Sequence, residues 1–377
     1  MKLINKKRLI ETFVELASIP SPSGQEEKIA QVLIEKLGSL GFKVQKDVYG
    51  NIIAKLDGFG NPIILCAHMD TVAVGEGEIR PAIFSGKIKS SGNTILGADN
   101  KDSITAIIEA ITVIKENNFL HQAIEIVLTK EEEIISIGAK NLNIALLSGD
   151  KCVISDNAAP YGIITVSAPY CFGFEAEIIG RRCHVKEPEK GINAMMIATT
   201  AIKKIPIGRV DLLTTSNIGY QISGLKGIID HVDVKTSDLA KQGRNNVPDM
   251  SLVYGEVRGA NLKTVIKTLD KIKEVFTKTA KHYGGKVKFL IEKKADGYLF
   301  DKQSALVSRV ASIFKAQGVN PEYLNSTGGS DANILNGRGI ETIVISSTHR
   351  NNHQTTEYLI IKDLVRLADF YIRLLQR

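Results

Sequence analysis

The sequence predicts an α/β protein that is interrupted by an inserted α+β unit. Near both ends of the chain, short apolar runs of strand length alternate with segments of helical periodicity. In the middle, the predicted elements instead follow the order strand, helix, strand, strand, helix, strand, which is typical of a ferredoxin-like unit. A chain of 377 residues is long enough for two or three domains.

The first half of the chain shows the alternating pattern. Residues 5–19 have apolar side chains at helical spacing, and Ser23 with Glu26 predicts a capping box that opens a second helix reaching Leu37. The run at residues 62–67 is continuously apolar, as expected for a strand buried on both faces. The other elements predicted in this half are strands at 43–48, 51–56, 123–128 and 152–154 and helices at 103–115 and 139–147.

The pattern changes near Phe172, where the insert begins. Its second helix has an apolar stripe opposite a lysine-rich side, so the stripe is expected to lie in a core or an interface. The stripe consists of Leu262, Val265, Ile266, Leu269, Ile272, Val275 and Phe276. The other elements predicted here are strands at 172–179, 216–223, 251–257 and 286–291 and a helix at 193–205.

After about residue 295 the α/β pattern returns, with a helix at 304–317, a strand at 342–345 and a helix from Ile361. The end of the chain is therefore expected to complete the first domain. The sequence predicts a discontinuous domain formed by residues 1–172 and 293–377, with residues 173–292 inserted as a second domain.

The composition is that of an ordered, soluble protein. Hydrophobic residues make up 44% and charged residues 24%, and the mean hydropathy is +0.01. The 48 basic and 41 acidic residues give a net charge of +7, but the basic residues are scattered and Trp is absent, so no nucleic-acid partner is expected. No apolar run is long enough to span a membrane and no signal peptide is recognised, which predicts a cytoplasmic protein without a membrane partner. The four cysteines form neither a CxxC pair nor a disulfide framework.

Metal-ligating residue types stand where several apolar runs end. In open α/β sheets the carboxyl ends of the strands meet at one edge, so these side chains are expected to converge. Singly, each has an ordinary explanation, such as a helix N-cap for Asp99 or a solvated turn for the acidic run at 131–133. The positions are His68 and Asp70, residues 131–133, Asp156, Asp99 and His353.

So many carboxylates at one edge are expected to repel one another unless cations lie between them. The mixture of imidazoles and carboxylates favours zinc or a similar first-row divalent ion. A shared carboxylate predicts a pair of ions about 3.5–4 Å apart that activates water for attack on a polarised carbonyl. Hydrolysis of an amide bond is therefore the expected reaction.

Eight segments, distributed over nearly the whole chain, form a recognisable set. They are HMDTV (68–72), LGADNK (96–101), TKEEEI with GAK (129–140), CHVKEPEKGINAM (183–195), NNVPD (245–249), GEVRG (255–259), GGSDANILNGRGI (328–340) and HQTTEY (353–358). In this order they resemble the M20 family of dinuclear zinc peptidases and, within it, the peptidase T-like tripeptidases. The resemblance implies a zinc-peptidase-like α/β/α catalytic domain with an inserted ferredoxin-like lid and dimerisation domain.

The resemblance also implies two Zn²⁺ ions per subunit, with Co²⁺ or Mn²⁺ as alternative metals. His68 and Asp156 match the ligands of one ion. Glu133 and His353 match those of the other, and Asp99 matches the carboxylate that bridges them.

Two further acidic residues match functional positions of the family. Glu132 matches the general base, and Asp70 matches the carboxylate that orients His68 and strengthens it as a ligand. Glu131 raises a question of register, which the spacing to GAK at 138–140 resolves in favour of Glu132 and Glu133.

Five residues match substrate-binding positions. His184 matches an oxyanion donor of the lid, often supplied across a dimer, and Asn246 and Arg258 match groups that bind the substrate backbone or terminal carboxylate. Gly328 and Gly329 form a turn that the family places beside the substrate. The expected partner is a small peptide, and the apolar helix of the insert is the candidate surface for a homodimer.

Some positions depart from the tripeptidase pattern. Asn100 replaces a second Asp, Ile135 replaces a frequent Gly, and Val185 with Lys186 replaces small residues after the lid histidine. These departures concern substrate preference and the lid rather than the metal ligands. The remaining histidines match no ligand position and are expected to be structural or surface residues, with His349 the one rival to His353; they are His121, His231, His282 and His349.

The leading hypothesis is a cytoplasmic dizinc aminopeptidase that releases the N-terminal residue of tripeptides. An M20-type carboxypeptidase or N-acyl amino acid deacylase would use the same dinuclear site and is the alternative. A non-catalytic peptide-binding protein is less favoured, because Glu132 and all the ligands are present. A serine or cysteine hydrolase is less favoured still, because there is no GxSxG elbow and no cysteine stands beside a base in a recognisable motif.

Overall fold

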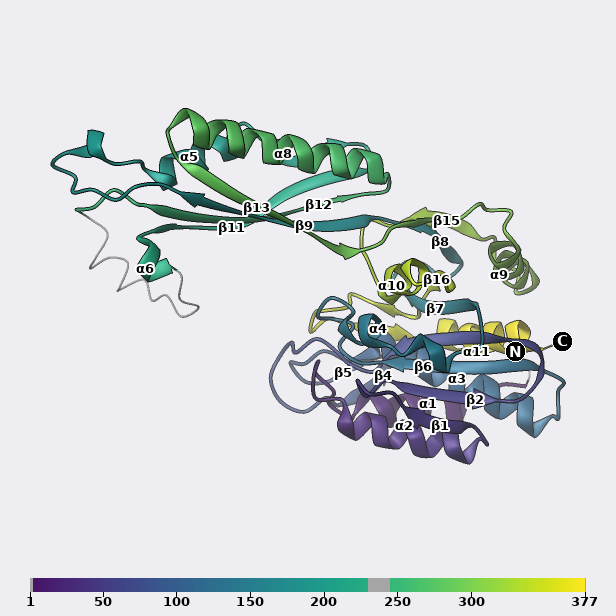
Figure 1. Ribbon diagram of the computed structural model, residues 1–377. Helices are drawn as coiled ribbons and strands as arrows, with labels where there is room; N and C mark the ends of the chain where they lie inside the picture. The colour runs from purple at the N-terminus through teal and green to yellow at the C-terminus, as the bar shows by residue number, and fades with distance from the viewer. Residues whose placement is uncertain (1–2, 230–244, 377) are drawn as a thin grey trace. The chain divides into compact units, whose positions relative to one another are not determined.

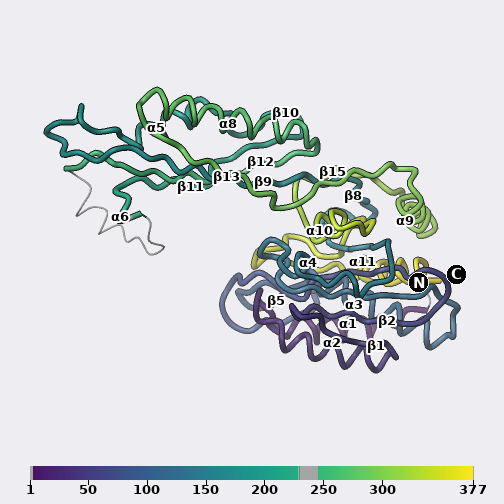
Figure 2. Tube along the Cα trace, viewed as in Figure 1, coloured from purple at the N-terminus to yellow at the C-terminus, as the bar shows by residue number. Residues whose placement is uncertain are grey.

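The computed structural model describes residues 3–229 and 245–376 (Figure 1). The chain divides into two compact units, the first made of Met1–Ala168 with Tyr298–Arg377 and the second of Pro169–Gly297. Figure 2 shows the chain leaving the first unit after β8 (Ile163–Ala168) and returning to it before α9 (Ala305–Ala316). Within the described ranges, no helix has both the length and the apolar character that crossing a bilayer requires.

The first unit is built on a nine-stranded sheet. Its strands are β1 (Lys43–Lys46), β2 (Ile52–Leu56), β3 (Phe59–His68), β6 (Gln122–Thr129), β7 (Lys151–Asn157), β8, β14 (Tyr298–Leu299), β15 (Glu322–Asn325) and β16 (Glu341–Ser346). Their order is β1-β2-β6-β3-β7-β16-β8-β14, with β15 paired to β8. The central strands β6, β3, β7 and β16 are parallel neighbours, so their carboxyl ends lie at one edge of the sheet.

Successive side chains of the central strands enter two apolar cores, one on each face of the sheet. On β3, Ile63 and Leu65 belong to one core and Ile64 and Cys66 to the other. The first core is covered by α1 (Lys6–Ala17), α2 (Glu27–Ser39), α3 (Ala98–Glu116), α9 and α11 (Ile361–Leu375). The second is covered by α10 (Asp331–Gly337) and by residues 142–147, which follow α4 (Ile137–Asn141). This layering confirms the predicted α/β class.

Two local predictions in this unit are wrong. Ser23 and Glu26 form no capping box, because α2 has no side-chain cap and Ser23 Oγ donates to Asp70 Oδ2 at 2.7 Å instead. The helix predicted at 139–147 is the short α4 followed by a 3₁₀ turn at Ile144–Leu146. In the first case the hydroxyl of Ser23 donates to Asp70, which is distant in sequence, instead of capping α2.

A second, four-stranded sheet in this unit was not predicted. Its strands are β4 (Pro81–Phe84), β5 (Lys87–Ser90), β17 (His349–Arg350) and β18 (Tyr358–Ile360), in the order β17-β18-β5-β4. The pairing of β18 with β5 joins segments from opposite ends of the chain, so no local pattern indicates it. The pairing of β17 with β18 holds together the two ends of the loop between them, which contains His353.

The second unit is an antiparallel sheet with α5 (Ala194–Ile202) and α8 (Leu262–His282) on one face (Figure 1). Its strands are β9 (Tyr170–Ile179), β10 (Gly208–Asp211), β11 (Thr214–Gly224), β12 (Met250–Gly259) and β13 (Lys286–Ala295), in the order β10-β11-β12-β9-β13; α6 (Lys226–Ile229) follows β11. The predicted ferredoxin-like order is present, and the edge strand β10 was missed. Of the predicted stripe, Leu262 and Ile266 are 41% and 39% exposed, whereas Leu269 and Phe276 are buried.

Candidate metal centre

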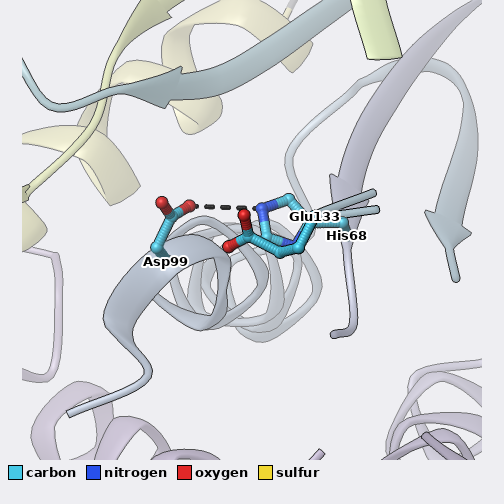
Figure 3. A group of neighbouring side chains, drawn as sticks. All are labelled: His68, Asp99 and Glu133. Carbon is cyan, nitrogen blue, oxygen red and sulfur yellow. Dashed lines mark hydrogen bonds and ion pairs between the residues drawn. The ribbon is translucent and has the colours of Figure 1, made fainter. Parts of the chain in front are cut away.

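Three side chains, His68, Asp99 and Glu133, each bring a ligand atom to within 4.8 Å of the others (Figure 3). His68 ends β3, and Glu133 follows β6, the parallel neighbour of β3. Asp99 lies in the first turn of α3, where its peptide bond to Asn100 is cis. Two neighbouring strand ends and the first turn of α3 therefore bring a histidine and two carboxylates together.

His68 lies among three carboxylates. Its Nδ1 lies 2.9 Å from the backbone oxygen of Asp70 and 3.4 Å from Asp70 Oδ1. Its Nε2 lies 3.2 Å from Asp99 Oδ1 and 3.7 Å from Asp156 Oδ1. Burial lowers the pKa of His68, but these carboxylates outweigh burial and raise it well above its usual range.

The second oxygen of Asp99 faces a different set of groups. Asp99 Oδ2 lies 3.5 Å from His353 Nε2 and accepts a hydrogen bond from Asn352 Nδ2 at 2.9 Å. His353 Nε2 lies 2.9 Å from Glu133 Oε2. The neighbouring carboxylates of Asp99 and Glu133 raise the pKa of His353 to about 10. One oxygen of Asp99 therefore faces His68, and the other faces His353.

Asp156 is held by Asn100, which the sequence analysis noted only as a departure from the tripeptidases. Asn100 Nδ2 donates to Asp156 Oδ1 at 2.9 Å and to the backbone oxygen of Ser155 at 2.7 Å. Burial, followed by the charge of Asp99, raises the pKa of Asp156 to about 7. An amide at position 100 donates to Asp156 where a second carboxylate would repel it.

Asp70 links the His68 strand to the acidic turn. Its Oδ1 accepts from the amide of Glu132 at 2.9 Å, and its Oδ2 accepts from the amide of Glu133 at 3.1 Å and from Ser23 Oγ at 2.7 Å. Asp70 is completely buried. One carboxylate thus fixes the ring of His68 and the backbone of both glutamates.

The three successive glutamates have different surroundings. Burial raises the pKa of Glu132 well above its usual range; the charge of His68 opposes this shift, and the nearby carboxylates add to it. Ser136 Oγ donates to Glu132 Oε1 at 3.4 Å. Glu131 instead accepts from the hydroxyl of Tyr49, so its side chain is engaged away from this group.

Glu357 supports the loop that presents Asp99. It is buried, and its two carboxylate oxygens accept four backbone N–H groups at 2.7–3.1 Å, those of Leu96, Gly97, Ala98 and Asp99. Sequence reasoning assigned Glu357 no role. The one available signal was its place in the HQTTEY segment.

The predicted substrate residues fall into two places. In the second unit, His184 and Asn246 form a β-bridge, and His184 Nδ1 accepts from the amide of Lys186 at 3.1 Å. Arg258 lies on β12 and donates to both carboxylate oxygens of Glu256, at 2.7 and 3.1 Å.

In the first unit, the glycine turn lies beside a predicted metal ligand. Gly328 and Gly329 line a cavity of about 200 Å³ together with Asp156, Tyr298 and Ser330. The cavity therefore connects the turn with the edge of the sheet where Asp156 lies.

Of the histidines that were assigned no ligand role, His349 is completely buried against Asp99. His121 contacts the backbone oxygen of Gln122, and His282 contacts Tyr283. His231 lies outside the described residues. His349 is therefore not a surface residue.

The residues present fit a divalent cation. The buried polar atoms at this edge that have no hydrogen-bond partner within residues 3–229 and 245–376 include Glu133 Oε1, Asn100 Oδ1 and His349 Nε2. Buried polar atoms without partners are rare in proteins. Imidazole nitrogens and carboxylate oxygens that converge in this way are ligands of zinc and related ions.

A sheet with helices on both faces and a group of imidazoles and carboxylates at its carboxyl edge is typical of a class of metal-dependent hydrolases. Residues 64–377 match the family described as "Peptidase family M20/M25/M40". The chain belongs to this peptidase family, which confirms the resemblance inferred from the eight segments.

Particular relatives cover nearly the whole chain. The Bacillus subtilis protein YqjE is 33% identical over 385 residues, which span 99% of each chain. The solved structures of aminopeptidase PepT from Bacillus cereus and of a tripeptidase from Staphylococcus aureus are each 32% identical, with a TM-score of 0.88 over 98% of both chains.

Proposed function

We propose that this protein is a dinuclear metallopeptidase that removes the N-terminal residue of small peptides, tripeptides in particular. The observation that supports it most is the position of Asp99, whose two oxygens face two separate sets of ligand atoms. A carboxylate between two such sets suits a pair of ions. The names of the aminopeptidase and the tripeptidase to which the chain is similar support the choice of substrate.

In this proposal His68 and Asp156 would hold one ion, Glu133 and His353 would hold the other, and Asp99 would contribute to both. The mixture of two imidazoles and three carboxylates suits Zn²⁺, and Co²⁺ or Mn²⁺ would fit the same donors. When bound, the two ions would supply an activated water and polarise the scissile carbonyl.

Glu132 acts as the general base in this mechanism. It accepts a proton on a carboxylate oxygen and passes it to the leaving amine. Burial raises the pKa of Glu132, which suits a group that takes up a proton and then releases it. Asp70 holds the tautomer and orientation of His68 and keeps the backbone of Glu132 in place.

The first unit is the catalytic domain in this proposal, and the second is a lid and dimerisation domain. His184 would donate to the developing oxyanion, and Asn246 with Arg258 would bind the substrate backbone or terminal carboxylate. To bind that carboxylate, Arg258 would have to give up its hydrogen bonds to Glu256. Gly328 and Gly329 would lie beside the substrate, and the enzyme is proposed to act in the cytoplasm.

Hydrolysis of a free tripeptide tests the proposal, with N-acetylated, C-amidated and dipeptide analogues run alongside it. Zinc-loaded and chelator-treated protein are compared, and the products are identified by mass. We expect chelator-sensitive release of the N-terminal residue from the free tripeptide. Release of the C-terminal residue, or of the acetyl group alone, would favour a carboxypeptidase or a deacylase that uses the same metals. Full activity without metal would overturn the mechanism.

A further inference from the structure

A third imidazole nitrogen points at Asp99. His349, in β17, is completely buried, and its Nε2 lies 3.6 Å from Asp99 Oδ2. Within the described ranges this nitrogen has no hydrogen-bond partner. A buried polar atom in this position requires a physical explanation.

The other nitrogen of the ring shows where the proton lies. His349 Nδ1 lies 2.7 Å from Ser347 Oγ and 3.2 Å from Asp102 Oδ2. Ser347 Oγ already donates to Asp102 Oδ2 at 2.6 Å, and the amide and hydroxyl of Thr348 donate to the same oxygen. Because the ionised carboxylate of Asp102 can only accept hydrogen bonds, the ring nitrogen that faces it, Nδ1 of His349, carries a proton. In the neutral form that a metal requires, the lone pair of Nε2 then faces Asp99.

The distance distinguishes a shared ion from a hydrogen bond. At 3.6 Å the contact between Nε2 and Asp99 Oδ2 is longer than a hydrogen bond. Two ligands held about 2.0–2.1 Å from one tetrahedral ion lie roughly 3.4 Å apart. His353 Nε2, a proposed ligand, lies at a similar 3.5 Å from the same oxygen.

The surroundings of His349 also repeat those of His68. His68 has the Asp70 carboxylate 3.4 Å from Nδ1 and an oxygen of Asp99 3.2 Å from Nε2. His349 has Asp102 at 3.2 Å and the other oxygen of Asp99 at 3.6 Å. A carboxylate behind a histidine is the usual support of a metal ligand.

We propose that His349 is a third histidine ligand of the dinuclear centre, bound through Nε2 to the ion on the Oδ2 side of Asp99. That ion would then be held by His349, His353, Glu133 and Asp99. Asp102 and Ser347 are positioning residues that fix the ring. The inference rests on the proposed dinuclear centre and adds a ligand to it.

The first test uses the wild-type protein, loaded with ¹¹³Cd²⁺ and labelled with ¹⁵N in its histidines. A ligand nitrogen shows a scalar coupling to cadmium, which a buried structural histidine does not. We expect three coupled Nε2 nitrogens, with the third signal lost in His349→Phe. A protein that binds two ions through two histidines would overturn the role of His349 and leave the proposed centre intact. A protein that binds fewer than two ions would overturn the centre itself.

The second test is the affinity of each metal site. Phe at position 349 keeps a ring of similar size without a nitrogen, and the thermal unfolding of the metal-free variant establishes that it folds. We expect one of the two Co²⁺ ions to bind more than about 100-fold more weakly, which exceeds the loss caused by removing an outer partner. His121→Phe, in the same unit, is the matched control and should bind both ions normally. Equal binding by His349→Phe would contradict the proposal.

Discussion

The two units differ in the kind of polar side chain that they bury. The buried polar side chains of the second unit, within its described residues, are five hydroxyl groups, on Thr214, Ser216, Ser251, Thr268 and Thr279. The first unit buries charged side chains around its sheet edge, including Asp70, Asp99, Asp102 and Glu357. All seven described non-glycine residues with positive φ also belong to the first unit, and five of them lie at 131–136 or 351–353.

The comparison shows where the fold gives up stability for a site. The second unit is an ordinary helix-on-sheet layer, whose core depends on apolar packing. The first unit holds carboxylates close together and bends the backbone beside them, and both arrangements cost free energy. Such costs are typical of functional sites and are offset by the apolar packing around them.

The largest effect is expected from Glu132→Gln. Loss of the proposed general base should lower kcat by about 10²–10⁴-fold, with metal content unchanged, because Glu132 is not a proposed ligand. Tripeptide hydrolysis and metal analysis of the same sample measure both quantities. Glu131→Gln is the matched control, because Glu131 interacts with Tyr49. A larger loss of activity in Glu131→Gln than in Glu132→Gln would identify Glu131, not Glu132, as the general base.

The second effect concerns the packing of the second unit. Phe276 is completely buried in α8, so Phe276→Ala should destabilise this unit by about 3–5 kcal/mol in urea unfolding monitored by circular dichroism. Leu290→Ala, at a position that is 64% exposed, should change stability by less than about 0.5 kcal/mol. Metal affinity should be unchanged in both variants. Loss of metal binding in Phe276→Ala would show that the two units do not behave separately.

The third effect is the pH dependence of metal binding. The proposed ligand His353 must lose its proton to bind a metal, and its pKa is raised to about 10 in the metal-free fold. Affinity should therefore increase at least about tenfold per pH unit between about pH 7 and about pH 9. The same raised pKa stabilises the metal-free fold below the unfolded value of about 6.5, and this contribution is lost as the pH rises through about 10. Calorimetric titration at several pH values measures the slope, and a flat profile would contradict the prediction.

The smallest effect concerns the bent backbone beside Glu132. Ile135 has a φ of 79°, which is strained for a β-branched residue, and its side chain is 64% exposed. Ile135→Gly should relieve this strain and stabilise the protein by about 1 kcal/mol after the added backbone entropy of glycine. Thermal unfolding measures the gain. Ile134→Gly has no positive φ to relieve and should destabilise slightly, so an equal gain in both would exclude strain as the cause.

The sequence predicted the parts of this fold that local patterns specify. The continuous apolar run before His68 predicted a doubly buried strand, and β3 is that strand. The helical stripe around Phe276 predicted α8. The short strands β4, β5, β17 and β18 were missed, because each gains its stability from pairing with a partner rather than from its own pattern.

The candidate site shows the same limit. Position at the end of an apolar run pointed to His68 and Glu133, and position in a turn before a helix pointed to Asp99; the fold brings the three together. The same reasoning could not find Glu357 as the cap of the Asp99 loop or Asn352 as a donor to Asp99, because these partners lie more than 200 residues apart in sequence.

The sequence by itself determined the family, the α/β class with its insert, and the residue types available at the sheet edge. Periodicity and motif spacing are local properties, so they can be read from one chain. Only the tertiary structure decided that Ser23 donates to Asp70 instead of capping a helix. It also decided that His349 lies completely buried beside Asp99. These outcomes depend on which distant segments meet, and burial and hydrogen bonding are fixed only after the sheet and its helices have packed.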